Sequence, residues 1–191
     1  MKQLWKSGTL LSPLPAVPVS LGTMENPNII TIAWTGILCS DPPKTYISVR
    51  KERYSYELLK KYGQFVINLP TAPLIRKIDL CGVKSGRDTD KFKVCDLTPE
   101  PSLSLGCPSI AESPLCLECR VSDVIPLGSH DMFIADIVAV NVDESIISNG
   151  KLCLEKAHLV SYAHGTYYAL GKKIGSFGFS VKKKRKKINK V

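Results

Sequence analysis

The stretch that decides the fold runs from Asn28 to Leu59 and reads NIITIAWTGILCSDPPKTYISVRKERYSYELL. In its first part, bulky apolar residues alternate with small ones, which is the period-2 pattern of a half-buried strand. The pattern predicts a strand over Asn28–Thr35. The bulky face carries Ile30, Ile32 and Trp34, and the small face carries Thr31, Ala33 and Thr35. A core position is therefore expected for Trp34, and a flat ligand could lie against the small face.

A second strand and a helix follow the sequence Asp41-Pro42-Pro43. Proline lacks an N–H and keeps the preceding residue extended, so this sequence is expected to end the first pairing. Thr45–Arg50 alternates again and predicts a strand, and Tyr54–Lys61 predicts a helix that stops at Gly63. Hydroxyl and guanidinium groups gather where this strand passes into the helix, at Ser48, Arg50, Arg53 and Ser55. Together with the free N–H groups of a helix N-terminus, they predict a phosphate site.

The rest of the chain is rich in strands with few helices. Further strands are predicted at Val17–Thr23, Gln64–Leu69, Leu115–Val124 and Met132–Val142, and a short helix at Leu74–Leu80. Two shorter segments, 151–154 and 167–170, have no clear pattern. We therefore expect a mainly β fold, a barrel whose openings are covered by helices.

Net charge and cysteine content narrow the class of protein. The chain has 191 residues and a net charge of +9, but its end, KKKRKKINK, holds seven basic residues and no acid. The remainder is nearly balanced, so nucleic acid is not expected as a partner, and the end is expected to be a solvated tail. Seven scattered cysteines without a secretion signal indicate reduced thiols and a cytoplasmic protein without a membrane span.

Several residue clusters have structural rather than chemical interpretations. Cys116 and Cys119 form a CxxC, but on a strand they would point to opposite faces, which argues against a disulfide; no second pair supports a zinc site. The three histidines have no metal spacing. The polar loop Cys81–Phe92 lacks the Gly-Lys-Ser/Thr ending of a P-loop, and no glycine fingerprint of a dinucleotide fold is present.

A family resemblance emerges from these motifs taken in order. The Asn28–Leu59 stretch resembles the flavin reductase-like family, whose fold is an FMN-binding split barrel. Five further blocks resemble the family in its order: NLP at 68–70, CGVKSGRDTDKF at 81–92, LECRV at 117–121, LGSHDMFIADIVAV at 127–140 and GTYYALGKKIGSFGFSV at 165–181. The resemblance implies one domain over residues 1–181, followed by the basic tail at 182–191.

What the resemblance implies for the site is specific. The loop bearing Lys84, Ser85 and Lys91 would close over the phosphate or ribityl chain of FMN, with Phe92 anchoring it in the core. Backbone N–H groups at Cys39–Asp41 would contact the pyrimidine end of the ring and tune its potential. No catalytic side chain and no metal are expected. The candidate FMN contacts are Thr31, Ala33, Trp34, Thr35, Cys39, Ser40, Asp41, Ser48, Val49, Arg50, Arg53, Ser55, Lys84, Ser85 and Lys91.

The function implied is that of a homodimeric oxidoreductase. Its flavin sites are expected at the subunit interface, where the partner would contribute aromatic and glycine-rich segments such as Tyr162–Leu170. NAD(P)H, binding transiently over the flavin, would reduce tightly bound or exchangeable FMN, and the electrons would pass to a flavin, metal or protein acceptor. Two alternatives stay open. The chain could carry electrons on bound FMN that a protein partner reduces, or it could be a non-enzymatic binding protein that uses its basic tail.

Overall fold

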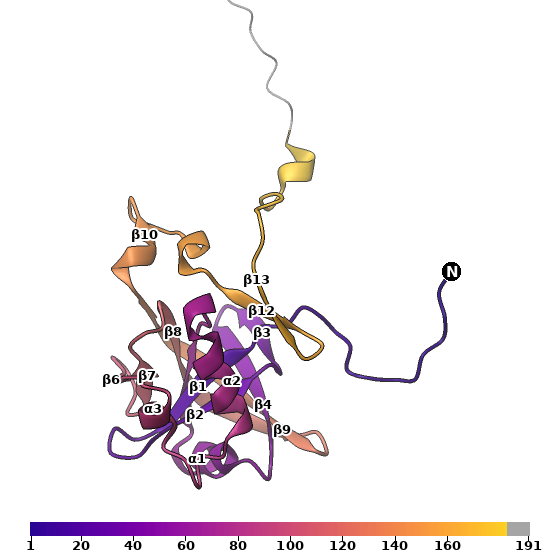
Figure 1. Ribbon diagram of the computed structural model, residues 1–191. Helices are drawn as coiled ribbons and strands as arrows, with labels where there is room; N and C mark the ends of the chain where they lie inside the picture. Colours follow the sequence, from indigo (N-terminus) through magenta and orange to yellow (C-terminus); the bar gives the residue numbers. More distant parts are fainter. Residues whose placement is uncertain (183–191) are drawn as a thin grey trace, which may run out of the picture.

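The computed structural model describes residues 1–182, and the predicted basic tail therefore lies, except for Lys182, outside the described residues. Seven antiparallel strands form the main sheet in the order β2-β1-β5-β8-β9-β4-β3 (Figure 1). Their bounds are β1 Val17–Gly22, β2 Pro27–Ile32, β3 Thr35–Ser40, β4 Pro43–Arg50, β5 Gln64–Asn68, β8 Leu115–Pro126 and β9 His130–Val142. The mainly β architecture expected from the sequence is confirmed.

The sheet has to curl because its two edge strands are neighbours in the sequence. Seven flat strands would hold the edges about 29 Å apart at the usual spacing of about 4.8 Å. Only Ala33 and Trp34 separate β2 from β3, which allows at most about 11 Å between the Cα atoms of Ile32 and Thr35. The sheet therefore closes into a barrel that is split between β2 and β3, which do not pair with each other.

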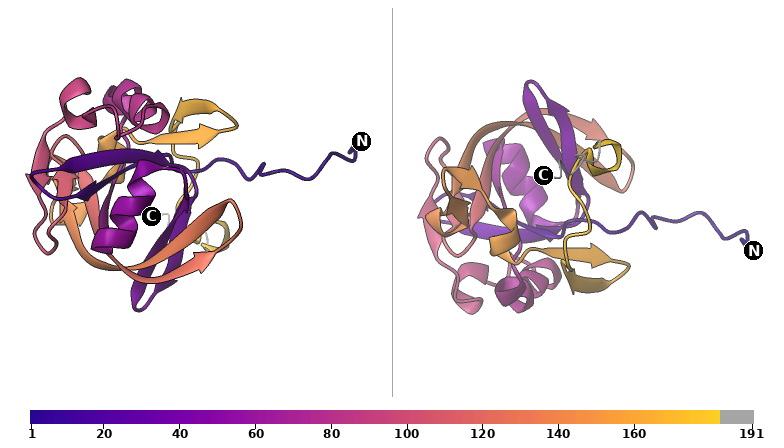
Figure 2. Two further views of the ribbon diagram at one scale, coloured as in Figure 1. Left: turned by 90° about the horizontal axis from the view of Figure 1, so that it is seen from below. Right: turned by 90° about the horizontal axis from the view of Figure 1, so that it is seen from above.

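Helices cover the barrel at two places. Helix α1, Tyr54–Tyr62, lies across one opening, as the views along the barrel show (Figure 2). Gly63 ends it with φ 62°, and the Gly63 N–H donates to the Leu59 carbonyl at 2.9 Å, as the sequence predicts. Helices α2, Ile75–Val83, and α3, Lys91–Val94, pack outside the barrel against β2.

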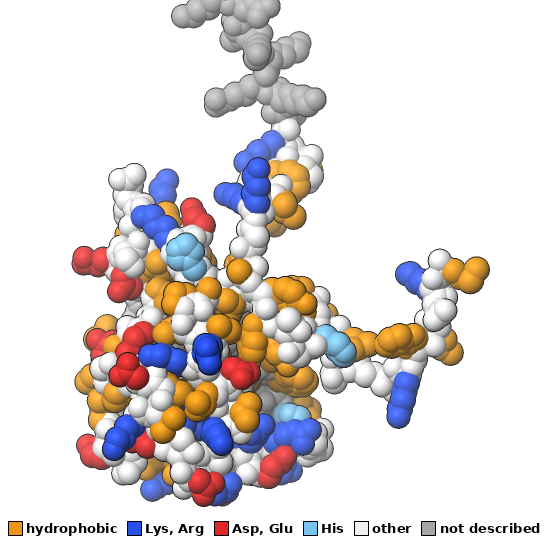
Figure 3. Space-filling view, viewed as in Figure 1, with side chains coloured by type: hydrophobic (Ala, Val, Ile, Leu, Met, Phe, Trp, Pro, Cys, Tyr) orange, Lys and Arg blue, Asp and Glu red, His pale blue; other side chains and the backbone are white. Residues whose placement is uncertain are grey.

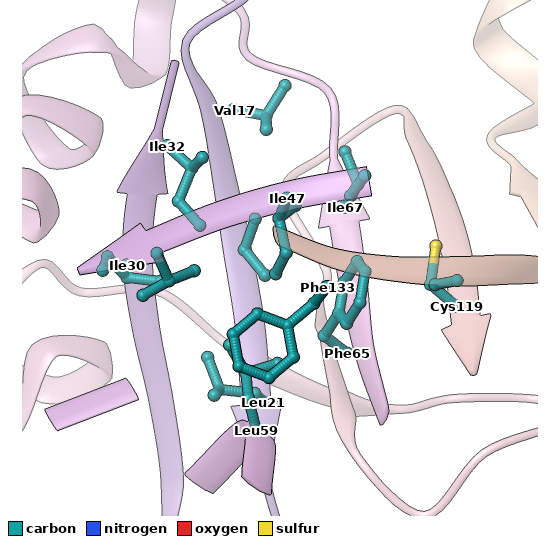
Figure 4. Close-up of a cluster of buried hydrophobic side chains, with 13 residues drawn as sticks. Val17, Leu21, Ile30, Ile32, Ile47, Leu59, Phe65, Ile67, Cys119 and Phe133 are labelled. Carbon is teal, nitrogen blue, oxygen red and sulfur yellow. The ribbon is translucent and has the colours of Figure 1, made fainter. Parts of the chain in front are cut away.

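Two apolar clusters hold these layers together. The barrel interior contains Phe65, Phe133, Ile47 and Leu21 from the strands and Leu59 from α1, all at most 1% exposed (Figure 4). A second cluster lies between β2 and the helices outside it, and its buried members are Ile29, Cys81, Phe92, Cys95, Leu97 and Ile110. Phe92 thus anchors its loop as predicted.

The remaining elements connect the barrel strands and close its rim. A separate hairpin, β12 Val160–Ala163 and β13 Thr166–Ala169, lies beside α2 (Figures 1 and 2). The others are short: β6 Pro99–Pro101, β7 Pro108–Ile110, β10 Ile147–Ser148, β11 Lys151–Leu152, and 3-10 turns at Ala72–Leu74, Glu144–Ile146, Leu154–Ala157 and Phe179–Val181. No helix among the described residues is long and apolar enough to span a bilayer.

One strand differs from the sequence-based expectation. The strand expected over Asn28–Thr35 stops at Ile32, and a separate strand, β3, pairs with β4 from Thr35 to Ser40. Pro43 opens β4 opposite Ser40, so Asp41 and Pro42 form a two-residue turn rather than the end of sheet pairing. The prediction failed because β3 is an edge strand with exposed side chains, and such strands lack the alternation of buried and exposed positions.

All seven cysteines are free, as predicted. Cys119 points into the barrel core, whereas Cys116 packs with Val66 and Cys107 in a different cluster. Their positions on opposite faces of β8 confirm that this CxxC is not a disulfide. Among the described residues, no group of three or more histidine, cysteine or carboxylate side chains could hold a metal ion.

Candidate functional site

Two adjoining hollows lie at the split side of the barrel. The first, here the strand pocket, is bounded by β2, β4, α2 and the β12–β13 hairpin; the second, the loop pocket, lies between the start of α1 and the segment after α2. Each has a volume of about 370 Å³, and they share Ile30, Arg50 and Arg53. The shared residues make the two hollows one continuous cleft, long enough for a ligand with a flat part and a charged part.

The strand pocket has a wall of small side chains, as the alternation predicts. Thr31 and Ala33 line it together with Ser48 and Val49 of the neighbouring strand segment. The Thr31 hydroxyl donates to the Ile78 carbonyl of α2, so it ties the helix to β2 and can offer a ligand only its oxygen lone pairs. This wall suits a planar ring.

Trp34 is not in the core. It is 41% exposed, lines the strand pocket, and lies parallel to the His130 ring, with ring centroids 6.4 Å apart and an angle of 2° between the planes. The expectation was wrong because β2 ends at Ile32, so the strand alternation no longer applies two residues later.

His130 is a pocket residue that sequence reasoning did not select as a candidate contact. It pairs with Arg50 across β4 and β9, which places the two side chains at neighbouring positions of the cleft. Its Nδ1 atom lies 2.9 Å from the Ser129 hydroxyl. Its position next to Trp34 depends on the β4–β9 register, which no local pattern near residue 130 reveals.

The β12–β13 hairpin supplies a second aromatic wall, whereas the sequence-based expectation placed this segment in the partner subunit's contribution to the site. Tyr162 and Tyr167 line the strand pocket with ring centroids 5.2 Å apart. The Tyr167 hydroxyl donates to Asp79 of α2 at 3.1 Å and so closes the hairpin onto the helix. Burial, reinforced by this hydrogen bond and by the carboxylate charge, raises the pKa of Tyr167 to about 12. Tyr167 therefore stays a neutral donor at physiological pH.

The loop pocket forms around the N-terminus of α1. No side chain caps the first turn of this helix. Ser55 is 2% exposed and accepts a hydrogen bond from the Asn28 amide at 2.8 Å, which leaves its own hydroxyl proton available as a donor. Gly86 packs closely against Asn28, so the segment after α2 approaches the helix start. Free N–H groups and a hydroxyl donor in one hollow favour an anion.

Lys91 is the most unusual residue of the loop pocket. Its side chain is 3% exposed, and the ammonium donates to the carbonyls of Ile29 at 2.6 Å and Cys81 at 2.8 Å. Burial lowers the pKa of Lys91. A buried ammonium held by neutral carbonyls keeps an uncompensated positive charge, and an anion in the hollow would stabilise it.

Other cations surround the same hollow. Arg50, Arg53, Lys84 and Arg87 line it with one acid, Glu52. Arg87, which sequence reasoning did not select, forms an ion pair with Glu57 and donates to the Glu52 carbonyl at 3.1 Å. These bonds join the segment after α2 to α1 and to the residues just before it.

The structure brings together eleven of the fifteen candidate residues and leaves four outside. Each of the eleven lines at least one pocket: Thr31, Ala33, Trp34, Ser48, Val49, Arg50, Arg53, Ser55, Lys84, Ser85 and Lys91. The four that line neither pocket are Thr35, Cys39, Ser40 and Asp41. Thr35 is buried and donates to the Tyr46 carbonyl at 2.6 Å. The other three lie at the far end of β3 and its turn, because this segment is a hairpin and not the loop expected beside the cleft.

The class of protein is defined by a split antiparallel barrel whose cleft has one flat wall and one cationic end. Comparison with known proteins identifies the family. The chain belongs to the family described as flavin reductase like domain, whose family model matches residues 13–171. The resemblance noted in the sequence is thereby confirmed.

Individual relatives cover most of the chain. The structure of flavoredoxin from Desulfovibrio vulgaris (Miyazaki F) is 33% identical, with a TM-score of 0.88 over 95% of this chain and 100% of that one. An FMN-binding protein from Thermus thermophilus shares the fold, with a TM-score of 0.78 at 22% identity over 92% and 99% of the two chains. A Pyrococcus abyssi protein is 30% identical over 142 residues, 74% of this chain and 81% of the relative.

Proposed function

We propose that this chain binds FMN, with the isoalloxazine ring in the strand pocket and the phosphate in the loop pocket. The observation that carries the proposal is the buried Lys91 ammonium beneath a hollow rimmed by Arg50, Arg53 and Lys84. A phosphate dianion matches this surplus of positive charge and the donors at the start of α1. The flat wall next to it, bearing Thr31 and Ala33, is where the ring would lie. The flavoredoxin and the FMN-binding protein with this fold support the same ligand.

The chemistry proposed is that of an oxidoreductase. Bound flavin would accept a hydride from NAD(P)H and pass the electrons to a flavin, metal or protein acceptor. The side chains of this chain then have binding roles. Lys91 and Arg50 would hold the phosphate, Trp34 and the Tyr162–Tyr167 wall would confine the ring, and no side chain is assigned a proton-transfer step. Carriage of electrons from a protein partner is the second candidate, favoured by the 33% identity to flavoredoxin.

The test of these proposals begins with FMN and FAD titrations of the purified protein, followed by anaerobic addition of NADH or NADPH. We expect FMN to bind more tightly than FAD. The cations and hydrogen-bond donors of the loop pocket suit a terminal phosphate, and no site among the described residues is assigned to the adenosine part of FAD. Bleaching of the flavin absorbance by NADH or NADPH supports the reductase. Flavin that only dithionite bleaches supports the carrier. A protein that takes up no FMN contradicts both and favours a non-enzymatic binding role.

Replacement of Arg50 by alanine is expected to raise the Kd for FMN roughly tenfold. A charge-assisted contact to phosphate contributes about 1.5–3 kcal/mol, and we take the lower end because the Arg50 side chain is 53% exposed and also pairs with Glu52 at 3.2 Å. Fluorescence titration with FMN measures the change. Arg76→Ala is the matched control, since Arg76 is exposed on α2 and lines neither pocket. Equal affinities for both variants and the parent would remove Arg50 from the site.

We also propose that the protein is a homodimer whose partner completes the strand pocket. Apolar side chains continue from Trp34 along edge strand β3, where Ile37 is 68% exposed and Leu38 46% exposed. The N-terminal segment and the described segment after β13, up to Lys182, extend from the body (Figures 1 and 3). They carry further exposed apolar side chains, such as Trp5 and Phe177. Surfaces of this kind are typical of protein–protein contacts.

Light scattering with size-exclusion chromatography tests the dimer. We expect twice the chain mass of about 21 kDa and a joint loss of dimer and flavin on dilution. A monomer that holds one FMN per chain would contradict the proposal. The sequence suggested that the partner would contribute the segment Tyr162–Leu170 to the site. In the structure, Tyr162 and Tyr167 line the pocket of their own chain, so the proposed dimer does not depend on that contribution.

A further inference from the structure

Two buried cysteines lie in contact outside the barrel. The Sγ atoms of Cys81 and Cys95 are 3.7 Å apart, and the residues are 1% and 5% exposed. They pack in the cluster between β2 and the outer helices. The other three buried cysteines, Cys107, Cys116 and Cys119, belong to different clusters. The contact is therefore specific to this pair.

The pair brackets the segment that lines the loop pocket. Cys81 lies in the last turn of α2, and Cys95 immediately follows α3. The chain between them carries Lys84, Ser85, Gly86 and Arg87 and then returns through Lys91. The Lys91 ammonium donates to the Cys81 carbonyl at 2.8 Å, so a hydrogen bond already joins the two ends of the segment beside the sulfur contact.

We propose that Cys81 and Cys95 form a redox-active thiol pair, which a peroxide oxidises to a disulfide that closes the base of this segment. An S–S bond is about 2.05 Å long, so the sulfurs have to approach by about 1.7 Å. Helix α3 is only four residues long and Cys95 stands at its end, so a small movement of α3 suffices. The bond would join the two ends of the segment 81–95, which carries side chains that line the loop pocket.

The reaction balances without any other reactant. One thiol attacks the O–O bond of hydrogen peroxide, which releases water and leaves a sulfenic acid; the second thiol attacks that sulfur and releases a second water. Two thiols thus lose two electrons and two protons, and one peroxide is reduced to two waters. A small cavity of about 10 Å³ beside Cys81, lined also by Ile78 and Leu97, offers room of the order of one water molecule next to the sulfur.

Oxidation should depend on opening of the segment. Burial raises the pKa of Cys81 to about 12, so the packed Cys81 thiol stays protonated and reacts slowly. This step rests on the proposed function: FMN in the loop pocket would hold the segment closed and slow disulfide formation several-fold. The thiol pair itself does not depend on flavin, so its test can be made without any.

The experiment uses full-length protein in which the two partly exposed thiols are removed, Cys39→Ser with Cys153→Ser, so that five cysteines remain. The flavin-free protein is treated with hydrogen peroxide, unfolded under acid, and analysed by thiol titration and intact mass. We expect three titratable thiols, a mass loss of about 2 Da that dithiothreitol reverses, and one cross-linked peptide that joins Cys81 to Cys95. Addition of Cys107→Ser, a buried cysteine of another cluster, should leave that mass loss in place.

Three outcomes would overturn the proposal. They are five unchanged thiols after treatment, a cross-link between other cysteines, or a mass gain of about 16 or 32 Da on single cysteines in place of the loss. Addition of Cys81→Ser or Cys95→Ser must abolish the mass loss, and its persistence would equally contradict the pair. Equal oxidation rates with and without bound FMN would contradict only the coupling to the loop pocket, whereas a failure to bind FMN would contradict the proposed function alone.

Discussion

Replacement of Lys91 by methionine is expected to raise the Kd for FMN by about ten- to a hundredfold. A hydrogen bond to a charged group is worth about 1.5–3 kcal/mol, and 1.4 kcal/mol corresponds to a factor of ten. Lys91 should reach the upper part of this range because its ammonium is buried, where solvent screens it least. Fluorescence titration with FMN, repeated with riboflavin, measures the effect. Riboflavin lacks the phosphate, so its affinity should change far less.

The same substitution should leave the fold intact. Methionine keeps the length of the aliphatic stem, and it removes a buried cation whose desolvation opposes folding. The cost is the loss of two hydrogen bonds, to the carbonyls of Ile29 and Cys81. The two effects oppose each other, so thermal unfolding of the flavin-free protein should change little.

Lys93→Met provides the matched control for this charge. Lys93 lies on the same short helix, is exposed, and lines neither pocket. Its replacement removes one positive charge from nearly the same place but should leave FMN affinity unchanged. If Lys91→Met and Lys93→Met bind FMN equally well, the buried ammonium does not hold the phosphate and the orientation proposed for FMN is wrong.

Replacement of Gly86 by alanine should have an effect of similar size through shape rather than charge. A Cβ atom at this position would stand 2.2 Å from the Asn28 amide oxygen and 2.9 Å from a ring carbon of Tyr54. Asn28 cannot simply swing away, because its amide nitrogen is hydrogen-bonded to Ser55. Overpacking of this kind costs about 1–3 kcal/mol. The segment must therefore move off the start of α1, and we expect the Kd for FMN to rise by about five- to a hundredfold.

Gly171→Ala distinguishes this clash from a general effect of losing a glycine. A Cβ atom at Gly171 meets no atom within 4 Å, and its backbone does not need the left-handed region. FMN affinity of this variant should equal that of the parent. A second readout is thermal unfolding: Gly86→Ala should lose affinity for FMN while the flavin-free barrel still unfolds cooperatively, because the clash lies outside the barrel core. Unchanged FMN affinity in Gly86→Ala would show that the loop pocket does not receive the phosphate.

Local sequence determined the strands, the family and much of the cationic pocket. The alternation around Ile30 and Ile47 indicates that one face of each strand is buried. This pattern can be read from neighbouring residues alone, without knowing which element packs against the strand. Arg50, Arg53 and Ser55 lie close together in the sequence, where β4 ends and α1 begins, so this junction alone brings them together. The glycine stop at Gly63 follows in the same way from backbone geometry.

Only the tertiary structure decided the walls of the strand pocket and the thiol contact. Trp34 faces the cleft because β2 ends before it, and His130 reaches it through the register of β4 with β9. Tyr167 contacts Asp79 across 88 positions of sequence, and Cys81 meets Cys95 through the packing of two helices. Sequence patterns report the periodicity of one segment, whereas these contacts depend on how a curled sheet closes and which distant segments cover its split.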